Sequence, residues 1–443
     1  MLPLALQQSI DASIELETLR LSYKPGDVLK GVVKKVSTSN VARSVIVTIG
    51  LVGRIKTKAT KSNGSDKSDS HYYGHADFCH GSTCIYQGPV EYGITTWPFT
   101  IEIPTALATD NPNPAVLEVH DIPPTFYTNS RERPGGSKRL DYLFCEYYLE
   151  AQVTDVSDRR NRPVSAIFPL CVRLPSSEIN ITTWETLIGS FENKVKTLHL
   201  DPEFAGKSLS FSQNLQSVFR RSTLPQYGYI LDVELASVMQ MENPDYISFR
   251  IRARSNQQET NKPSLIEKPP TLTLMAVSIR LEYSLRTGPL EGSYATADME
   301  TTWEELSRID WEEHPGKPGM VIPNGLDEHT RYLDLGTSFG LRLTCHGLSC
   351  LEQSTWAKRF QPYPKPFSPS YVTGLMSCAY QLRWTIKVAC AGKIRKIRSI
   401  IPVRVVGPSD DWEFRKSSLL GPQGVLKAHR DWTGGFIRAP VLV

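Results

Sequence analysis

The chain has 443 residues, of which 40% are hydrophobic, so it can bury a sizeable core and is not expected to be disordered. Its net charge of +4 is too small to indicate nucleic-acid binding, and no uninterrupted apolar run approaches the roughly 18 residues that a membrane-spanning helix needs. The apolar N-terminus lacks the basic residues and cleavage site of a signal peptide. The eight cysteines are therefore expected to be reduced thiols in a cytoplasmic protein.

In the first half of the chain, apolar and polar residues alternate with the period of two that is typical of strands with one buried face. Pro25-Gly26-Asp27 predicts a turn, because Pro presets φ, Gly supplies a positive φ and Asp can bond its own backbone. Alternation on both sides predicts two strands joined by a tight connection. Further strands are predicted over 45–51, 97–103, 143–153 and 168–174, with long loops over 60–84 and 105–138.

The middle of the chain has a different pattern. Apolar residues recur at steps of three and four from Trp184 to Leu198, and Thr182 with Glu185 forms a capping box. This spacing predicts an amphipathic helix over 183–198. Residues 199–224 are expected to form a polar linker.

The second half returns to alternation. Many strands with Gly and Pro between them, and no regular exchange of strands with helices, favour antiparallel sheets. We therefore predict an all-β protein of two tandem antiparallel immunoglobulin-like β-sandwiches, with a short amphipathic helix in the connecting segment. Strands are predicted over 229–235, 247–253, 275–285, 333–343, 376–390 and 397–405. The expected divisions are an N-terminal sandwich, the connecting segment, a C-terminal sandwich and a tail, at 1–175, 176–225, 226–408 and 409–443.

Several motifs, in this order along the chain, resemble those of the α-arrestin family. Residues 23–33 resemble its first hairpin, Tyr-x-Pro-Gly-Asp-x-x-x-Gly-x-Val, and 97–104 resemble its Phe-Pro-Phe-x-(Ile/Leu)-x-(Ile/Leu)-Pro strand, with Trp97 in place of the first Phe. Residues 121–126 resemble its Leu-Pro-Pro-Ser-Phe motif, and the Tyr-x-Leu-x-Ala strand follows at 147–151. In the second half of the chain, three segments resemble the fungal arrestin-like C-terminal domain, at 369–373, 380–384 and 390–393. The resemblance implies two β-sandwiches in tandem.

The resemblance also implies a non-catalytic adaptor, which binds membrane-protein cargo tails and couples them to trafficking or ubiquitination machinery. The expected partners are proteins, namely cargo tails and a WW-domain ubiquitin ligase, with peripheral contact to the plasma membrane or endosomes, no nucleic acid and no cofactor. Family members recruit such ligases through Pro-Pro-x-Tyr or Leu-Pro-x-Tyr motifs.

Only the second of these motifs occurs here. Phe126 stands at the Tyr position after Pro123-Pro124, whereas Leu224, Pro225 and Tyr227 match Leu-Pro-x-Tyr. Such a segment can dock in an aromatic groove if it is exposed. The alternative is that Tyr227 begins a strand, which would make the motif inaccessible because strand backbones are already paired.

Two basic clusters are candidate binding sites. The period of two places Arg250, Arg252 and Arg254 on one face of a strand, opposite the core. Guanidinium groups can bind carboxylate or phosphate in a bidentate manner, so this arginine stripe is a candidate platform for an acidic or phosphorylated cargo tail; the alternative is a face paired with acids on neighbouring strands. The second cluster comprises Lys393, Arg395, Lys396 and Arg398. It is a candidate contact to anionic lipid, and the alternative is that these side chains are simply solvated.

His71, His75, Cys79, His80 and Cys84 are crowded into one predicted loop, at spacings that permit a tetrahedral zinc site. The segment is rich in Gly and Ser and contains no Cys-x-x-Cys pair, so an ordinary polar loop is favoured and no metal is expected. The sequence also contains no Gly-x-Ser-x-Gly, phosphate-binding glycine loop or His-Glu-x-x-His motif. We therefore do not expect an enzyme.

Two other functions stay open at this point. One is a constitutive structural subunit of a vesicle coat or a retromer-like complex, which would need a permanent partner instead of a cargo tail. The other is a metal-dependent enzyme built on the His/Cys segment at 71–84, which metal analysis of the purified protein would reveal.

Overall fold

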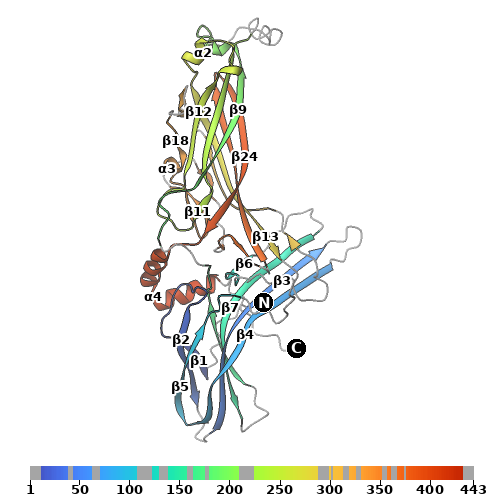
Figure 1. The fold of residues 1–443 in the computed structure, drawn as a ribbon, viewed down its shortest axis with the longest axis vertical. Helices are drawn as coiled ribbons and strands as arrows, with labels where there is room; N and C mark the ends of the chain where they lie inside the picture. The colour runs from blue at the N-terminus through green and yellow to red at the C-terminus, as the bar shows by residue number, and fades with distance from the viewer. Residues whose placement is uncertain are drawn as a thin grey trace.

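The computed structural model is predominantly β, as the sequence predicts. It describes residues 11–37, 43–61, 70–106, 122–128, 138–156, 163–174, 179–208, 224–287, 299–300, 303–312, 319–325, 331–351, 357–360, 367–373 and 376–432. The described strands divide into two groups, and no pair of strands among them joins one group to the other. Figure 1 shows the groups as two elongated bodies placed end to end, with a helix beside their junction.

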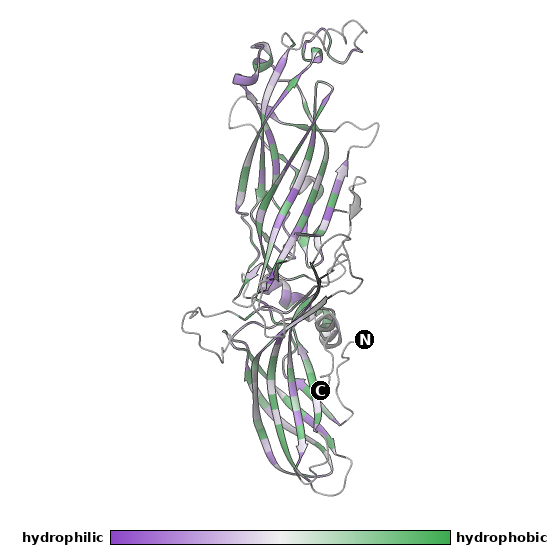
Figure 2. Ribbon diagram, turned by 90° about the vertical axis from the view of Figure 1, so that its right-hand side faces the viewer, coloured by the Kyte–Doolittle hydropathy of each residue, from purple (hydrophilic) through white to green (hydrophobic). Residues whose placement is uncertain are grey.

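The N-terminal body contains two antiparallel sheets. One sheet consists of β1 (Ala12–Leu16), β2 (Val28–Ser37) and β5 (Gly93–Glu102). The other consists of β4 (Ser70–Val90), β3 (Arg43–Lys61), β7 (Lys138–Asp155), β6 (Phe126–Thr128) and β8 (Val164–Leu170). Alternate residues of both sheets are buried, so the hydropathy alternates along the strands (Figure 2).

The C-terminal body is larger. One of its sheets consists of β9 (Thr186–Lys196), β10 (Gln226–Ala236), β12 (Phe249–Asn256), β17 (Asn324–Gly325) and β18 (Leu333–Asp334). The central strands of the other are β24 (Lys393–Val406), β23 (Met376–Cys390), β13 (Leu272–Thr287) and β15 (Glu304–Glu312). Its shorter strands are β11 (Val238–Gln240), β14 (Met299–Glu300), β16 (Met320–Ile322), β21 (Ala357–Phe360) and β22 (Tyr371–Val372).

The remaining elements are short, with one exception. A separate hairpin is formed by β19 (Arg342–Thr344) and β20 (Gly347–Ser349). The helical segments are η1 (Leu198–Leu200), η3 (Gln257–Glu259), α2 (Ser264–Glu267), α3 (Leu335–Phe339) and the longer α4 (Asp410–Trp432). No helix in the described part of the chain has both the length and the apolar character that crossing a membrane requires.

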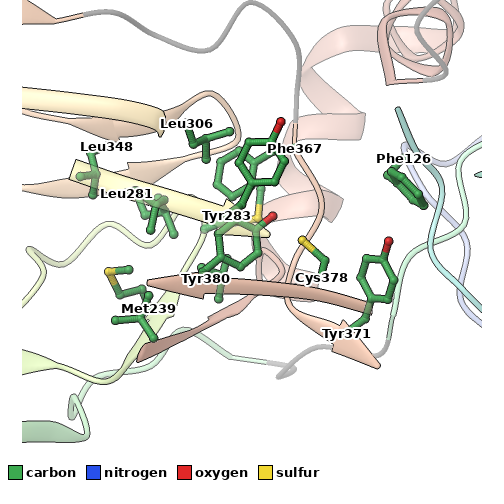
Figure 3. Packing of buried hydrophobic residues seen from close by; sticks show 14 of the residues in the cluster. Phe126, Met239, Leu281, Tyr283, Leu306, Leu348, Phe367, Tyr371, Cys378 and Tyr380 are labelled. Carbon is green, nitrogen blue, oxygen red and sulfur yellow. The ribbon is translucent and has the colours of Figure 1, made fainter. Parts of the chain in front are cut away.

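Aromatic side chains fill the junction between the bodies. Phe126 of β6 faces Tyr371 of β22 (Figure 3), with their ring centroids 5.8 Å apart. Tyr371 is buried, and the Tyr380 hydroxyl donates to the Ser368 carbonyl at 2.5 Å. The apolar core is continuous through this region, since one cluster of buried residues includes members of both bodies.

The predicted turn at residues 24–27 is confirmed. The Asp27 N–H donates to the Lys24 carbonyl at 3.0 Å, and Gly26 has a φ of 87°, as a turn with Pro and Gly at its centre requires. The predicted tight connection is wrong, however, because β1 ends at Leu16 and β2 begins only at Val28. The intervening segment instead reaches across to the last strand region of the same body.

The amphipathic helix predicted over 183–198 is wrong. Residues 186–196 form β9, which pairs antiparallel with β10 along its whole length. Phe191 packs edge-on against Trp384 at 5.1 Å, and Val195 is buried. From Gly189 to Lys196, buried or half-buried residues alternate with exposed ones, so the inward-facing side chains follow a period of two. Strand pairing with β10 overrides the local helical spacing. Part of the connecting segment predicted at 176–225 therefore belongs to a sheet of the C-terminal body.

Three further expectations are corrected. The loop predicted over 60–84 is largely strand, because β3 extends to Lys61 and β4 begins at Ser70. The strand predicted over 333–343 is interrupted by α3, which Asp334 caps by accepting from the Thr337 N–H at 2.9 Å. The sheets are also not purely antiparallel, since the pairs β11–β24 and β12–β17 are parallel.

Candidate functional site at the junction

The candidate site is built around Arg173, which follows β8 in the N-terminal body. A short parallel bridge joins Tyr23 to Val172. In it, the Tyr23 N–H donates to the Cys171 carbonyl at 2.8 Å and the Arg173 N–H donates to the Tyr23 carbonyl at 2.9 Å. This bridge places Ser22 and Lys24 beside the Arg173 side chain.

Helix α4 supplies the acidic half of the site. Ser409 precedes the helix and is fully buried, and its hydroxyl accepts from the Trp412 N–H at 3.3 Å. The first turn carries Asp410, Asp411 and Glu413, which is favourable because the N-terminus of a helix has positive partial charge. Asp410 and Glu413 lie on the side of this turn that contacts the N-terminal body.

Arg173 binds this turn through several atoms. Its Nη2 donates to Asp410 Oδ1 at 2.5 Å, its Nη1 donates to the Pro408 carbonyl at 3.2 Å, and its Nε lies 2.8 Å from Glu413 Oε1. The Ser22 hydroxyl lies within 2.8 Å of both carboxylate oxygens of Glu413. Lys24 Nζ donates to Asp410 Oδ2 at 2.5 Å. Two cations thus face two carboxylates, and only 8% of the Arg173 side chain is exposed.

The pKa values of the two carboxylates are shifted in opposite directions. Burial pushes the pKa of Asp410 upward, but hydrogen bonds from Lys24 and Arg173 outweigh burial, so its pKa lies below the usual value. For Glu413, burial dominates over the attraction of Arg173 and the hydrogen bond from Ser22, and its pKa is raised. Asp410 is therefore the carboxylate that the site holds most firmly in its charged form.

An open groove of about 520 Å³ adjoins these ion pairs. Its walls include Arg20, Lys24 and Asp27 from the N-terminal body, and Phe414 and Ser418 from α4. The Phe414 side chain is largely exposed, at 76%. The groove is therefore lined by both basic and acidic side chains, with the exposed Phe414 beside them. The basic ones are Arg20, Lys24 and Arg173, and the acidic ones are Asp27, Asp410 and Glu413.

The arginine stripe predicted from the sequence lies on one face, but it is not a free platform. Arg252 and Arg254 both donate to Asp232, at 3.1 and 2.7 Å, and Asp232 is 1% exposed. Arg250 lies 3.6 Å from both Glu234 and Asp334. The alternative of pairing with acids on neighbouring strands is thus the one observed. Asp232 and Glu234 of β10 lie directly opposite Arg252 and Arg250, and Asp334 of β18 lies opposite Arg250 on the other side.

The Leu-Pro-x-Tyr motif is inaccessible as the chain is folded. Leu224 is 7% exposed and Tyr227 is fully buried within β10. The Tyr227 hydroxyl bonds Ser255 at 2.9 Å and Asn324 at 3.1 Å. Leu224 and Pro225 lie directly before β10, and Tyr227 is its second residue. The expected WW-domain contact would therefore require this strand to open.

The second basic cluster lies on the hairpin that joins β23 to β24. All four of its cations are exposed, and Ile394 beside them is 59% exposed. The strand period places Lys396 and Arg398 on one face, and Lys393 and Arg395 on the other. Arg395 also donates to the Lys194 carbonyl at 3.1 Å. Contact with anionic lipid stays a prediction for this hairpin.

The His/Cys segment does not form a loop around a common centre. His71 and His75 are four positions apart on β4, which separates their backbones by about 13 Å in an extended strand. Cys79 has a positive φ of 60°, and Cys84 is exposed. Within the residues that the structure describes, no three His, Cys, Asp or Glu side chains are placed to hold a metal ion.

Sequence reasoning missed the residues of the junction site. One usable signal was Pro408-Ser409 followed by Asp410, Asp411 and Glu413, which is the composition of a helix start. No family model and no curated protein matches this sequence. The α-arrestin resemblance therefore rests on the short motifs described above.

Proposed function

We propose that this protein is a non-catalytic, arrestin-like adaptor that binds an acidic or phosphorylated segment of a partner protein, such as the tail of a membrane cargo, in the junction groove. The observation that carries the proposal is that an acidic turn of the chain's own α4 is seated on Lys24 and Arg173. In this account, α4 occupies part of the surface that a cargo segment would bind.

The chemistry of the groove supports this assignment. Arg173 offers a rigid fork of donors that suits carboxylate and phosphate oxygens, whereas Lys24 adds a more flexible point charge. Arg20 stands at the groove with 57% of its side chain exposed. The exposed Phe414 adds an apolar contact beside the charges. A partner segment with acidic groups next to an apolar residue fits this arrangement.

A peptide titration tests the proposal. A fluorescent acidic peptide with one phosphoserine is titrated against the wild type, Asp410→Asn and Lys24→Gln. Asp410→Asn should raise affinity because it weakens the internal competitor, whereas Lys24→Gln should lower it because a cation is lost. Lys30→Gln, at an exposed position on β2, removes the same charge away from the groove and should change nothing. Equal affinities for all four proteins would contradict the proposal.

The alternative of a constitutive coat or retromer-like subunit is supported by a different observation. β9 is an end strand of its sheet among the described strands, and Leu187 and Ile188 on it are 45% and 60% exposed. An open edge strand with exposed apolar residues is a surface that another chain can extend. Gentle purification would favour this alternative if it yielded one stable complex of fixed stoichiometry.

A further inference from the structure

A second pocket lies on the face of the β4–β3–β7 sheet that points away from the main core. Antiparallel register places Asp77, Arg54 and Glu146 in one row across the three strands. The next row places His75 beside Lys56. These rows and the rings of Tyr73 and Tyr148 frame a pocket of about 370 Å³.

Arg54 is buried, but only some of its hydrogen-bond donors have partners among the described residues. Its Nε pairs with Glu146 Oε1, and its guanidinium carbon lies 5.2 Å from the centre of the Tyr148 ring. Glu146 Oε2 is buried and has no hydrogen-bond partner among the described residues, so the pair is not bidentate. Within the same residues, no hydrogen bond or ion pair occupies the two terminal nitrogens of Arg54. These nitrogens are therefore donors that a ligand can use.

Lys56 is a second cation without a partner. No ion pair or hydrogen bond of its ammonium group occurs in the described structure, and its side chain is half-buried beside Arg54. Burial, and then the neighbouring Arg54 cation, lower its pKa from the usual value. The carboxylates of Glu146 and Asp77 attract Lys56 and oppose this shift, but less strongly. A bound anion would add to the partial compensation that these two carboxylates give the Arg54 and Lys56 cations.

We propose that this pocket binds an aryl phosphate, with its phosphoryl group between Arg54 and Lys56 and its ring against Tyr73. Guanidinium and ammonium groups are the usual protein partners of phosphate oxygens. Tyr73 is 55% exposed, and Lys58 lies 5.7 Å above its ring, so a flat aromatic ligand has an exposed edge and a cation nearby. The inference is independent of the proposed adaptor role, because it concerns a different sheet face.

Asp77 sets the balance of charge in the pocket. It is exposed and lies opposite Arg54 on β4, where its carboxylate opposes an incoming anion. Glu146 is already paired with Arg54. Removing the charge of Asp77 should therefore strengthen anion binding, while removing the charge of Lys56 should weaken it. The two substitutions make opposite predictions without disturbing the Arg54–Glu146 pair.

Calorimetric titration with phenyl phosphate and with inorganic phosphate tests the site. We expect the wild type to bind phenyl phosphate saturably and more tightly than inorganic phosphate. Lys56→Gln should weaken phenyl phosphate binding about tenfold or more, the typical effect of losing a charge-assisted hydrogen bond, and Asp77→Asn should tighten it. Lys30→Gln serves as the charge-matched control and should leave binding unchanged. Thermal melts of each variant show that it is folded.

Tyr73→Ala should weaken binding of phenyl phosphate while leaving inorganic phosphate unaffected. A phosphotyrosine peptide distinguishes two sources of the ligand. If the peptide binds more tightly than phenyl phosphate, the ligand is a phosphorylated protein. If the two bind equally, the ligand is a free aryl phosphate. If folded Lys56→Gln and Asp77→Asn both bind phenyl phosphate like the wild type, the site is overturned. Equal affinity of the wild type for phenyl phosphate and inorganic phosphate would overturn the aryl assignment.

Discussion

Replacing Arg173 should release helix α4 from the N-terminal body. Arg173→Gln leaves Glu413 buried without its cation and removes the bonds to Asp410 and to the Pro408 carbonyl. Breaking a buried ion pair costs about 3–5 kcal/mol, and we take the lower end, about 3 kcal/mol, because a third of the Asp410 side chain is exposed. At 1.36 kcal/mol per tenfold, this corresponds to about a 100-fold larger population of undocked helix.

Hydrogen exchange of residues 410–420 measures this population. Arg173→Gln should speed exchange of these amides about 100-fold, because the undocked helix is that much more populated. The strands of the C-terminal body should keep their protection. Arg173→Lys should fall between, since Lys keeps the charge but loses the fork of donors. Arg20→Gln is the control, because it removes only the exposed ion pair between Arg20 and Asp27, whose atoms are 3.5 Å apart. It should lower the free energy of helix docking by under about 1 kcal/mol. The reasoning is refuted if α4 exchanges at the wild-type rate in Arg173→Gln.

Four other predictions concern the ion pairs and the buried tyrosine. Because the pKa of Asp410 is lowered, its charged form stabilises the docked helix above about pH 4. This stability is lost as pH falls through the lowered pKa. In Asp410→Asn, the hydrogen-exchange protection of α4 should therefore no longer decrease at acidic pH. The raised pKa of Glu413 has the opposite effect, since the stability that its neutral form gives is lost as pH rises through the raised pKa. Glu413→Gln should therefore make the protection of α4 less dependent on pH above about pH 4.5. In urea unfolding, Asp232→Asn should lower the free energy of unfolding by about 3 kcal/mol, because it removes the buried carboxylate that Arg252 and Arg254 both bind. Arg250→Gln, at a side chain that is 45% exposed, should lower it by under about 1 kcal/mol. Equal losses would contradict the pairing. Tyr227→Phe should cost about 1 kcal/mol for its lost hydrogen bonds, and a WW domain that binds the folded wild type through this residue would contradict its burial.

The strand pattern and the first turn could be predicted because they depend on local sequence. Alternation at 143–153 and 376–390 reports one buried face directly, and both stretches lie in the long strands β7 and β23. The turn at 24–27 depends only on the backbone preferences of Pro and Gly. In contrast, β9 shows helical spacing in its sequence and is a strand because β10 pairs with it, which is a contact that local spacing cannot reveal.

The candidate site was harder to predict for the same reason. Arg173 and Asp410 are 237 positions apart in the chain. Asp410 belongs to a recognisable helix start, but nothing in the local sequence pairs that start with Arg173. The arginine stripe was placed on the correct face, because the strand period fixes that face. Its acidic partner Asp232 was missed because the register between β10 and β12 decides which residues are opposite each other.

The most direct test of the account is hydrogen exchange of α4 with and without a saturating acidic phosphopeptide. The peptide should speed exchange at residues 410–420, because it takes the place of Asp410 on Lys24 and Arg173. It should also slow exchange around residues 20–24, where it would bind. A bound peptide that leaves the exchange of α4 unchanged would contradict the claim that the helix and the cargo segment share this groove.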